Sequence, residues 1–345
     1  MKAGFYTQYK EFSQNRMFQA TSTGIGDDLN YPLVYLQKAA NDAGIKVSTI
    51  DTEPLESYDA IFFLDFPKKE NRYYRELVKM GLENMYLVMF ESEIIRPDNF
   101  DPKNHKHFKK IFTWKDTLVD NKKYFKIFLP NDIPDVFPPG PKKDKLCVMI
   151  AGNKYVSRSL QLYGERVKAI RWFEKNHPED FDLYGIGWDR YRFKGPKPIR
   201  VLNRIKGLTR LLNPHYTSYA GQIERKRPVL QRYKFSICYE NARDIPGYIT
   251  EKIFDCFFAG CVPVYWGAPN ITDYIPEETF IDKRKYSSYE ELYAYLKNMP
   301  DKEYEGYQKA IRNYVKSDMI RLFSAENFAE IIIEEIKDSK QDGRI

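Results

Sequence analysis

Residues 233–281 contain the densest group of side chains that could bind an anionic ligand. A strand pattern ends at Glu240, and after a polar loop a helix is expected to start near Thr250. In α/β sheets, ligands bind at the carboxyl ends of strands and at helix N-termini, which carry about +0.5 charge and free amide donors. Lys252 would lie in the first helical turn, where a bound phosphate would relieve the unfavourable position of a cation. Glu251 beside it offers an acceptor for sugar or ribose hydroxyls, although on the pattern alone both side chains could be ordinary solvated helix residues.

The order of residues in this stretch resembles the signature region of glycosyltransferase family 10, the α-1,3/1,4-fucosyltransferases. The matching segments are, in chain order, Tyr239-Glu240-Asn241, then GYITEK at 247–252, then AGCVPVYWG at 259–267. The family often has Phe and Asp where this chain has Tyr239 and Gly247. Neither departure removes one of the charge-bearing groups proposed for donor binding, but both could alter how the donor is held.

The resemblance implies an inverting transferase that moves L-fucose from GDP-β-L-fucose to a glycan hydroxyl. The expected linkage is α-1,3 or α-1,4, and the expected acceptor is a cell-surface polysaccharide or a lipopolysaccharide-type glycan. The residues implied for donor binding are Arg166, Glu240, Asn241, Tyr248, Glu251 and Lys252. Of these, Lys252 and Asn241 should contact the diphosphate, and Tyr248 and Glu251 the ribose or sugar.

Arg166 is the arginine implied to meet the diphosphate from the preceding helix. Its guanidinium fork suits two phosphate oxygens. Arg158 and Arg171 remain alternative counterparts, and a surface helix charge is the alternative role for Arg166.

The general base is expected in the first part of the chain. A buried strand pattern at 85–92 places Glu91 and Glu93 at a strand's carboxyl end, and the family's catalytic glutamate occurs in a similar context. An inverting transferase needs one base near the acceptor hydroxyl, and the resemblance favours Glu91 over Glu93. Protein cations can hold the leaving diphosphate, so no metal or other cofactor is expected to be essential.

Three other patterns suggest metal or phosphate chemistry only weakly. Asp180-Phe181-Asp182 has the spacing of a metal-binding D-x-D motif, but it precedes a buried strand and is interpreted as a cap or turn. His105 and His107 lie in a basic segment without ligand partners at zinc spacing. The glycine-rich residues 24–28 lack the remaining glycine and the lysine of a phosphate loop, and are interpreted as a flexible loop facing the cleft.

Residues 190–234 are strongly basic, with 13 Lys or Arg and the single acidic residue Glu224. Within them, residues 199–213 space apolar and basic side chains as an amphipathic helix does. Such a helix can lie on an anionic membrane, can cover an anionic donor or acceptor, or can be a solvated insertion. The net charge of the whole chain is only +7, so a nucleic-acid partner is not indicated.

Composition gives expectations about location. Hydrophobic residues make up 43% and charged residues 30% of the 345 residues, the balance of a globular protein. The four cysteines lack CxxC spacing and lie mostly in apolar runs, which predicts buried free thiols in a reducing compartment. No leader pattern and no run of about 18 apolar residues occurs. We therefore expect a cytoplasmic enzyme, which could be peripheral on the inner face of the plasma membrane, and an accidental sequon at 270–272.

Strand and helix patterns alternate along the chain and predict an α/β protein of GT-B type, with two Rossmann-like domains facing a central cleft. The predicted segments are a first domain at 1–130 with the general base, a Pro-rich linker at 131–145, a donor-binding domain at 146–300, and C-terminal helices at 301–345 that could pack back across the domains. One helix is expected after an Asn30 cap, and others at 288–298 and 301–336.

Two further functions are compatible with these patterns. One is a transferase of the same family that uses another GDP-linked sugar. The other is a non-catalytic protein that binds a nucleotide sugar or a glycan. Release of GDP in the presence of acceptor would distinguish an enzyme from a binding protein.

Overall fold

The computed structural model describes residues 1–19, 30–134 and 143–341, which fold as two compact units. Unit 1 comprises Met1–Ile133, Ile245–Glu251 and Ser317–Ile345, and unit 2 comprises Pro134–Asp244 and Lys252–Lys316. Neither unit is therefore one continuous stretch of chain. The glycine-rich residues 24–28, interpreted above as a loop facing the cleft, and most of the predicted linker lie outside the described residues.

Unit 1 is built on a six-stranded, all-parallel sheet with the order β2-β1-β3-β4-β5-β6. Its strands are β1 (Lys2–Thr7), β2 (Lys46–Thr49), β3 (Ala60–Leu64), β4 (Met85–Val88), β5 (Lys110–Thr113) and β6 (Tyr124–Lys126). Every residue of β3 and β4 is buried, which explains their unbroken apolar sequences. β6 lies at the edge of this sheet and pairs with β5 through residues 124–126.

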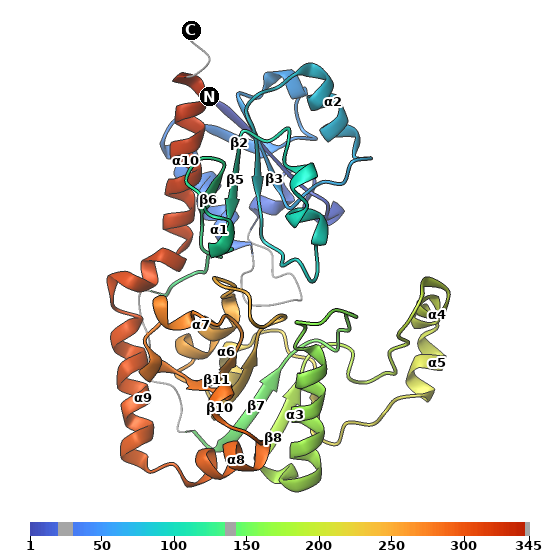
Figure 1. Ribbon diagram of the computed structural model, residues 1–345, viewed down its shortest axis with the longest axis vertical. Helices are drawn as coiled ribbons and strands as arrows, with labels where there is room; N and C mark the ends of the chain where they lie inside the picture. Colours follow the sequence, from blue (N-terminus) through green and yellow to red (C-terminus); the bar gives the residue numbers. More distant parts are fainter. Residues whose placement is uncertain (20–29, 135–142, 342–345) are drawn as a thin grey trace. The chain divides into compact units, whose positions relative to one another are not determined.

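Helices cover both faces of this sheet (Figure 1). The helices of unit 1 are α1 (Tyr31–Asp42), α2 (Arg72–Met80) and α10 (Ala325–Gln341). Leu36 of α1 and Ile332 of α10 share one hydrophobic core with Phe62 of β3. On the other face, Leu77 of α2 packs in a second core with Phe63. The alternate side chains of β3 thus serve two cores.

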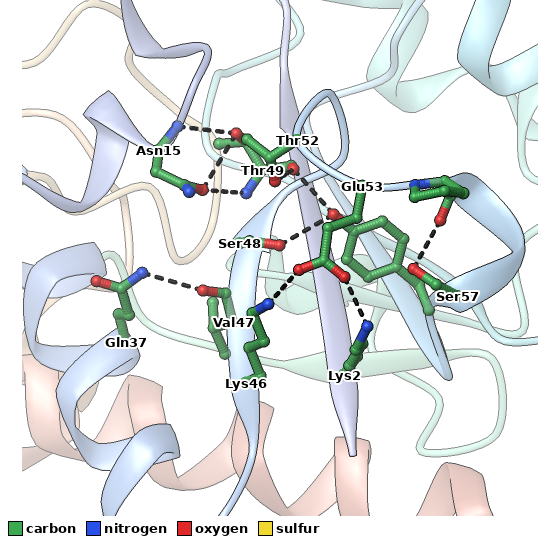
Figure 2. Close-up of polar contacts among 12 residues, drawn as sticks. Lys2, Asn15, Gln37, Lys46, Val47, Ser48, Thr49, Thr52, Glu53 and Ser57 are labelled. Carbon is green, nitrogen blue, oxygen red and sulfur yellow. Dashed lines mark hydrogen bonds and ion pairs between the residues drawn. The ribbon is translucent and has the colours of Figure 1, made fainter.

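The edge of this sheet is held by polar contacts around β2 (Figure 2). The Glu53 carboxylate pairs with the ammonium groups of both Lys2 and Lys46. The Thr49 backbone N–H donates to the Asn15 side chain over 2.7 Å. The first contact ties Glu53, which follows β2, to both strands, and the second ties β2 to the segment that follows β1.

Two predictions about helix boundaries are wrong, one at the start of α1 and one at the start of α10. Asn30 precedes α1, but its side chain makes no capping hydrogen bond. The single helix expected at 301–336 is interrupted after Tyr314, and α10 starts anew at Ala325. The break has a structural reason, because the helix before it belongs to unit 2 and α10 to unit 1. Ser324 is extended at the break, and its Oγ accepts from the N–H of Asn327.

Unit 2 also contains a six-stranded parallel sheet, with the order β12-β11-β10-β7-β8-β9. Its strands are β7 (Lys145–Ile150), β8 (Phe181–Tyr184), β9 (Tyr219–Gly221), β10 (Tyr233–Tyr239), β11 (Val262–Trp266) and β12 (Ile281–Asp282). Its helices are α3 (Tyr163–Asn176), α4 (Lys197–Val201), α5 (Lys206–Leu211), α6 (Arg227–Leu230), α8 (Tyr289–Asn298) and α9 (Asp301–Tyr314). A further helix, α7 (Glu251–Phe258), starts where the chain passes from unit 1 to unit 2. The two parallel α/β units confirm the predicted fold class.

The amphipathic helix expected at 199–213 is replaced by the two short helices α4 and α5. Between them Ile205 leaves the helical conformation, with φ −86° and ψ 86°. The Asn203 side chain accepts from the Phe193 N–H and donates to the Phe193 carbonyl, which fixes the chain between α4 and α5. Among the described residues, no helix combines the length and apolarity needed to cross a bilayer.

Candidate functional site

Glu240 and Lys252 form an ion pair at the carboxyl end of β10. The Glu240 side chain is fully buried, and its Oε2 accepts a hydrogen bond from the Lys252 Nζ over 3.2 Å. The Glu240 N–H donates to the carbonyl of Trp266, the last residue of the neighbouring β11. A buried carboxylate is costly without a cation, so Glu240 fixes the position of the Lys252 ammonium at the start of α7.

Arg166 of α3 converges on the same strand end. Its guanidinium donates to the carbonyls of Tyr239 over 2.6 Å and Glu240 over 2.9 Å, and to Asn241 Oδ1 over 3.1 Å. The side chain is 5% exposed. The alternative role of Arg166 as a surface charge is therefore wrong, because the guanidinium is buried and ties α3 to the end of β10. Arg166 also orients the Asn241 side chain.

The two alternative arginines lie elsewhere. Arg171 pairs with Glu174 and donates to the carbonyls of Pro214 and His215. Arg158 is exposed in the loop before α3. Of the three candidates, Arg166 is the one that hydrogen-bonds the Glu240-Asn241 strand end.

Tyr265 and Gly267 shape the surroundings of Glu240, and the sequence analysis assigned them no role. A Cβ on Gly267 would lie 2.4 Å from the Tyr265 Oη and 2.5 Å from the Glu240 Cγ. Burial raises the pKa of Tyr265, and the Glu240 carboxylate raises it further. The Tyr265 hydroxyl accepts from the Ala268 N–H over 3.0 Å. Gly267 could have been singled out from the sequence, because it directly follows the strand pattern within the segment at 259–267.

The predicted sugar-contacting residue Tyr248 belongs to unit 1. It is 2% exposed, and its ring centroid lies 4.7 Å from that of Trp114. Gly247 before it has φ +81°, and a Cβ there would lie 2.3 Å from the Trp114 carbonyl oxygen. Only glycine fits this close approach, which explains the residue that stands where the family often has Asp. The donor contacts predicted for Tyr248 and Glu251 stay predictions.

Glu91 lies in unit 1 at the carboxyl end of β4, where Asp65 fixes its backbone. Asp65 Oδ1 accepts from the N–H groups of Phe90 over 2.9 Å and Glu91 over 3.1 Å, and from Asn99 Nδ2 over 2.6 Å. Burial raises the pKa of Asp65. Asp65 has φ +62°, a left-handed conformation that acidic and amide residues tolerate better than most. The sequence analysis did not single out Asp65, although it directly follows a buried strand.

Glu93 and Tyr9 complete the polar surroundings of Glu91. The Glu93 carboxylate pairs with the Lys115 ammonium at 2.5 Å. Burial raises the pKa of Tyr9, and the carboxylates of Glu91 and Asp65 raise it further. A phenol therefore stays protonated near Glu91, while Glu93 is engaged by a cation.

The D-x-D carboxylates have structural partners within unit 2. Asp180 accepts from the Tyr293 hydroxyl and pairs with Lys297, both at 2.6 Å. Asp182 accepts from the Tyr233 hydroxyl over 2.5 Å. Asp180 lies in the turn before β8, as interpreted, whereas Asp182 lies within β8 itself, so the interpretation as a cap or turn is wrong for Asp182.

His105 is likewise held by neighbours in unit 1. Its Nδ1 lies 2.8 Å from the Tyr124 hydroxyl and its Nε2 lies 2.7 Å from the Asn99 carbonyl oxygen. Burial lowers the pKa of His105, so the ring is neutral at neutral pH. Within the described ranges, no group of three or more His, Cys, Asp or Glu side chains is arranged to hold a metal ion. The four cysteines are buried free thiols, as the sequence predicts.

Comparisons with known proteins match the C-terminal part of the chain most clearly. Residues 212–329 match the family model described as glycosyltransferase family 10 (fucosyltransferase) C-term. An α-(1,4)-fucosyltransferase of Arabidopsis thaliana is 30% identical over 136 residues, 36% of this chain and 34% of that protein. The α-(1,3)-fucosyltransferase FucT of Helicobacter pylori is 33% identical over 75 residues, 22% of this chain and 16% of that protein. The matches thus span about a third or less of these relatives.

Solved structures share the fold over nearly the whole chain. A crystal structure of an α1,3-fucosyltransferase has a TM-score of 0.54 at 13% identity, covering 98% of this chain and 90% of that chain. Anabaena Alr3699/HepE, in complex with UDP-glucose, has a TM-score of 0.54 at 12% identity, covering 98% of this chain and 100% of that chain. Together with the two parallel sheets, these likenesses confirm the predicted GT-B-type fold.

Proposed function

We propose that this chain, whose residues 212–329 match the family model described as glycosyltransferase family 10 (fucosyltransferase) C-term, is an inverting fucosyltransferase. The proposed donor is GDP-β-L-fucose, and the proposed acceptor is a hydroxyl of a cell-surface polysaccharide or lipopolysaccharide-type glycan. The expected product is an α-1,3 or α-1,4 fucoside. The observation that carries this proposal is the convergence of Arg166, Glu240, Asn241 and Lys252 on the carboxyl end of β10.

Donor binding is proposed at this strand end because it combines a fixed cation with a helix N-terminus. Glu240 holds the Lys252 ammonium in the first turn of α7. Arg166 holds the Asn241 amide beside it. A diphosphate would meet the ammonium and the amide donors at this point. In support, an α1,3-fucosyltransferase of the same fold has been crystallised with GDP.

The proposed reaction is a single displacement with inversion. The acceptor oxygen forms a bond to the anomeric carbon of fucose, and its proton passes to the Glu91 carboxylate. The bond between the anomeric carbon and the β-phosphate oxygen breaks, and GDP leaves with the electron pair. Lys252 and the amides of α7 stabilise the growing negative charge on the leaving group. Because these groups supply positive charge, we propose that a metal is not essential.

Two observations favour Glu91 as the base over Glu93. The backbone N–H of Glu91 is hydrogen-bonded to Asp65, which fixes the point on the backbone from which the Glu91 side chain extends. The Glu93 carboxylate is paired with the Lys115 ammonium, so it is already engaged by a cation of unit 1. We also propose a cytoplasmic location, which is supported by four buried free thiols.

The test is incubation of the purified chain with GDP-fucose and a glycan panel, followed by mass spectrometry of the products. We expect a fucosylated product and stoichiometric GDP, with activity retained after treatment with EDTA. Parallel reactions with GDP-mannose and UDP-glucose test the donor. Transfer only from another GDP-sugar would change the donor, and GDP binding without any product would indicate a binding protein.

A further inference from the structure

Residues 190–212, here called the basic arm, form an ordered extension of unit 2. Figure 1 shows its helices α4 and α5 at the end of a segment that leaves the sheet of this unit. The N–H of Tyr191 donates to the carbonyl of Thr209 over 2.6 Å, which closes the arm on itself. The Asn203 side chain holds both backbone groups of Phe193. These hydrogen bonds hold the backbone of the arm together at two points.

The arm exposes an unusual number of large apolar side chains. Six of the twelve exposed large hydrophobic residues in the described part of the chain lie within it. They are Tyr191, Ile199, Val201, Ile205, Leu211 and Leu212. Leu211 is the extreme case, with 83% of its surface exposed. Exposed apolar residues gathered on one element mark a contact surface rather than the scattered exposure of an ordinary surface.

The same arm carries only positive charge. It has eight Lys or Arg, and no Asp or Glu occurs between Asp189 and Glu224. Arg190 pairs with Asp189 at the base of the arm. Toward its end, Arg200, Arg204 and Lys206 are exposed, and none of them forms an ion pair with another described residue. Their charges face solvent and are accessible to an external anionic surface.

We propose that the basic arm docks the protein on an anionic lipid bilayer. Leu211, Ile205 and Val201 would enter the boundary between headgroups and acyl chains, while the basic side chains contact the lipid phosphates. Interfacial segments bind in this way when apolar burial and attraction to anionic lipid act together. A nucleic acid would satisfy the cations but would leave Leu211 in water. A second copy placed arm against arm would bring like charges together.

This proposal is independent of the proposed catalytic activity, because it concerns a surface and can be tested without donor or acceptor. The probe is sedimentation with vesicles of phosphatidylcholine alone or mixed with phosphatidylglycerol. We expect binding to the mixed vesicles that weakens as salt rises, and little binding to phosphatidylcholine alone.

Two variants separate charge from apolar contact. The triple variant Arg200→Glu/Arg204→Glu/Lys206→Glu should weaken binding at least about tenfold, since each cation near an anionic surface contributes. The variant Ile205→Ser/Leu211→Ser should weaken it several-fold at unchanged charge. A matched charge control is Lys302→Glu/Lys309→Glu/Arg312→Glu on the exposed side of α9, which should bind as the unaltered chain does.

A fluorescent reporter gives a measurement that does not depend on a loss of binding, which misfolding of a variant could also cause. Leu211→Trp should show a blue shift in tryptophan emission on adding mixed vesicles, because the indole leaves water. Unchanged emission would overturn the proposal, as would unchanged vesicle binding by the Ile205→Ser/Leu211→Ser variant. Binding of single-stranded RNA but not of mixed vesicles would also overturn it and assign the arm to nucleic acid. Dimers that dissociate in the Leu211 variants, without vesicle binding, would assign it to self-association.

Discussion

Asp65 Oδ1 lies 3.1 Å from the backbone nitrogen of Glu91 and accepts its hydrogen bond. Asp65 directly follows β3 and Glu91 lies shortly after β4, so one buried carboxylate joins the ends of two neighbouring strands. The Asn99 amide donates to the same oxygen. This contact fixes the loop that carries the proposed base, and it identifies Asp65 as a positioning residue that does not itself touch substrate.

Replacing Asp65 by Ala should lower kcat and leave the affinity for GDP unchanged. The N–H groups of Phe90 and Glu91 would lose their acceptor, which should also cost at least about 2 kcal/mol of unfolding free energy. Kinetics at saturating donor, GDP titration and urea unfolding measure the three effects. Asp65→Asn keeps an acceptor oxygen and should restore most of kcat; an Asn variant as slow as the Ala variant would contradict a positioning role.

Glu91→Gln should lower transfer by at least about 100-fold, because an amide cannot accept the acceptor proton. Binding of GDP, measured by calorimetry, should not change. Glu93→Gln is the matched control, and it should keep most of the activity because Glu93 is paired with Lys115. The assignment would be reversed if the Glu93 variant lost activity and the Glu91 variant kept it.

Lys252→Ala should also lower transfer by at least about 100-fold, since it removes the cation proposed to face the leaving diphosphate. It should weaken GDP binding as well, unlike the change at Glu91. Removing the ammonium leaves the Glu240 carboxylate buried without its partner, so stability should fall too. Lys252→Arg keeps the charge and serves as a control for stability. Normal turnover by the Ala variant would remove Lys252 from the site.

Gly267→Ala should disturb the donor site through Glu240. The new methyl group would lie 2.5 Å from the Glu240 Cγ and 2.4 Å from the Tyr265 Oη, which is too close for either atom to stay in place. We expect weaker GDP binding and a lower melting temperature. Gly306→Ala is the control, because nothing lies within 4 Å of a Cβ there and it stands inside α9. That change should stabilise the chain by about 0.5–1 kcal/mol. Equal effects of the two substitutions would contradict the packing argument.

Glu53→Gln should destabilise unit 1 in a pH-dependent way. Two hydrogen bonds, the larger effect coming from Lys2 and the smaller from Lys46, lower the pKa of Glu53 from 4.5 to about 2 (Figure 2). A lowered pKa stabilises the fold above the unfolded value, and this contribution is lost as pH falls from about 4.5 toward about 2. Urea unfolding at about pH 6 and about pH 3 should therefore show a difference from the unaltered chain that shrinks on acidification. Glu56→Gln, an exposed change a few residues further along the chain, is the matched control.

Much of the element pattern could be predicted because it depends on local sequence. The unbroken apolar runs of β3 and β4 indicate strands buried on both faces, and both are found. β1 was not predicted, since KAGFYT has no such run, yet it pairs with β2 and β3 inside the sheet. The helix predicted at 301–336 was interrupted because chain topology requires it to pass from one unit to the other, which helical periodicity does not report.

By itself the sequence determined the alternation of strands and helices, the family signature at 239–267, and the start of α7 with Glu251 and Lys252 in its first turn. Only the tertiary structure decided which distant residues meet: Arg166 with the Glu240 carbonyl, Asp65 with the Glu91 N–H, and Gly247 with the Trp114 carbonyl. The physical reason is that parallel strands bring their carboxyl ends to one edge of a sheet. Which side chains share that edge follows from strand order and register, and these are set by packing across the whole unit.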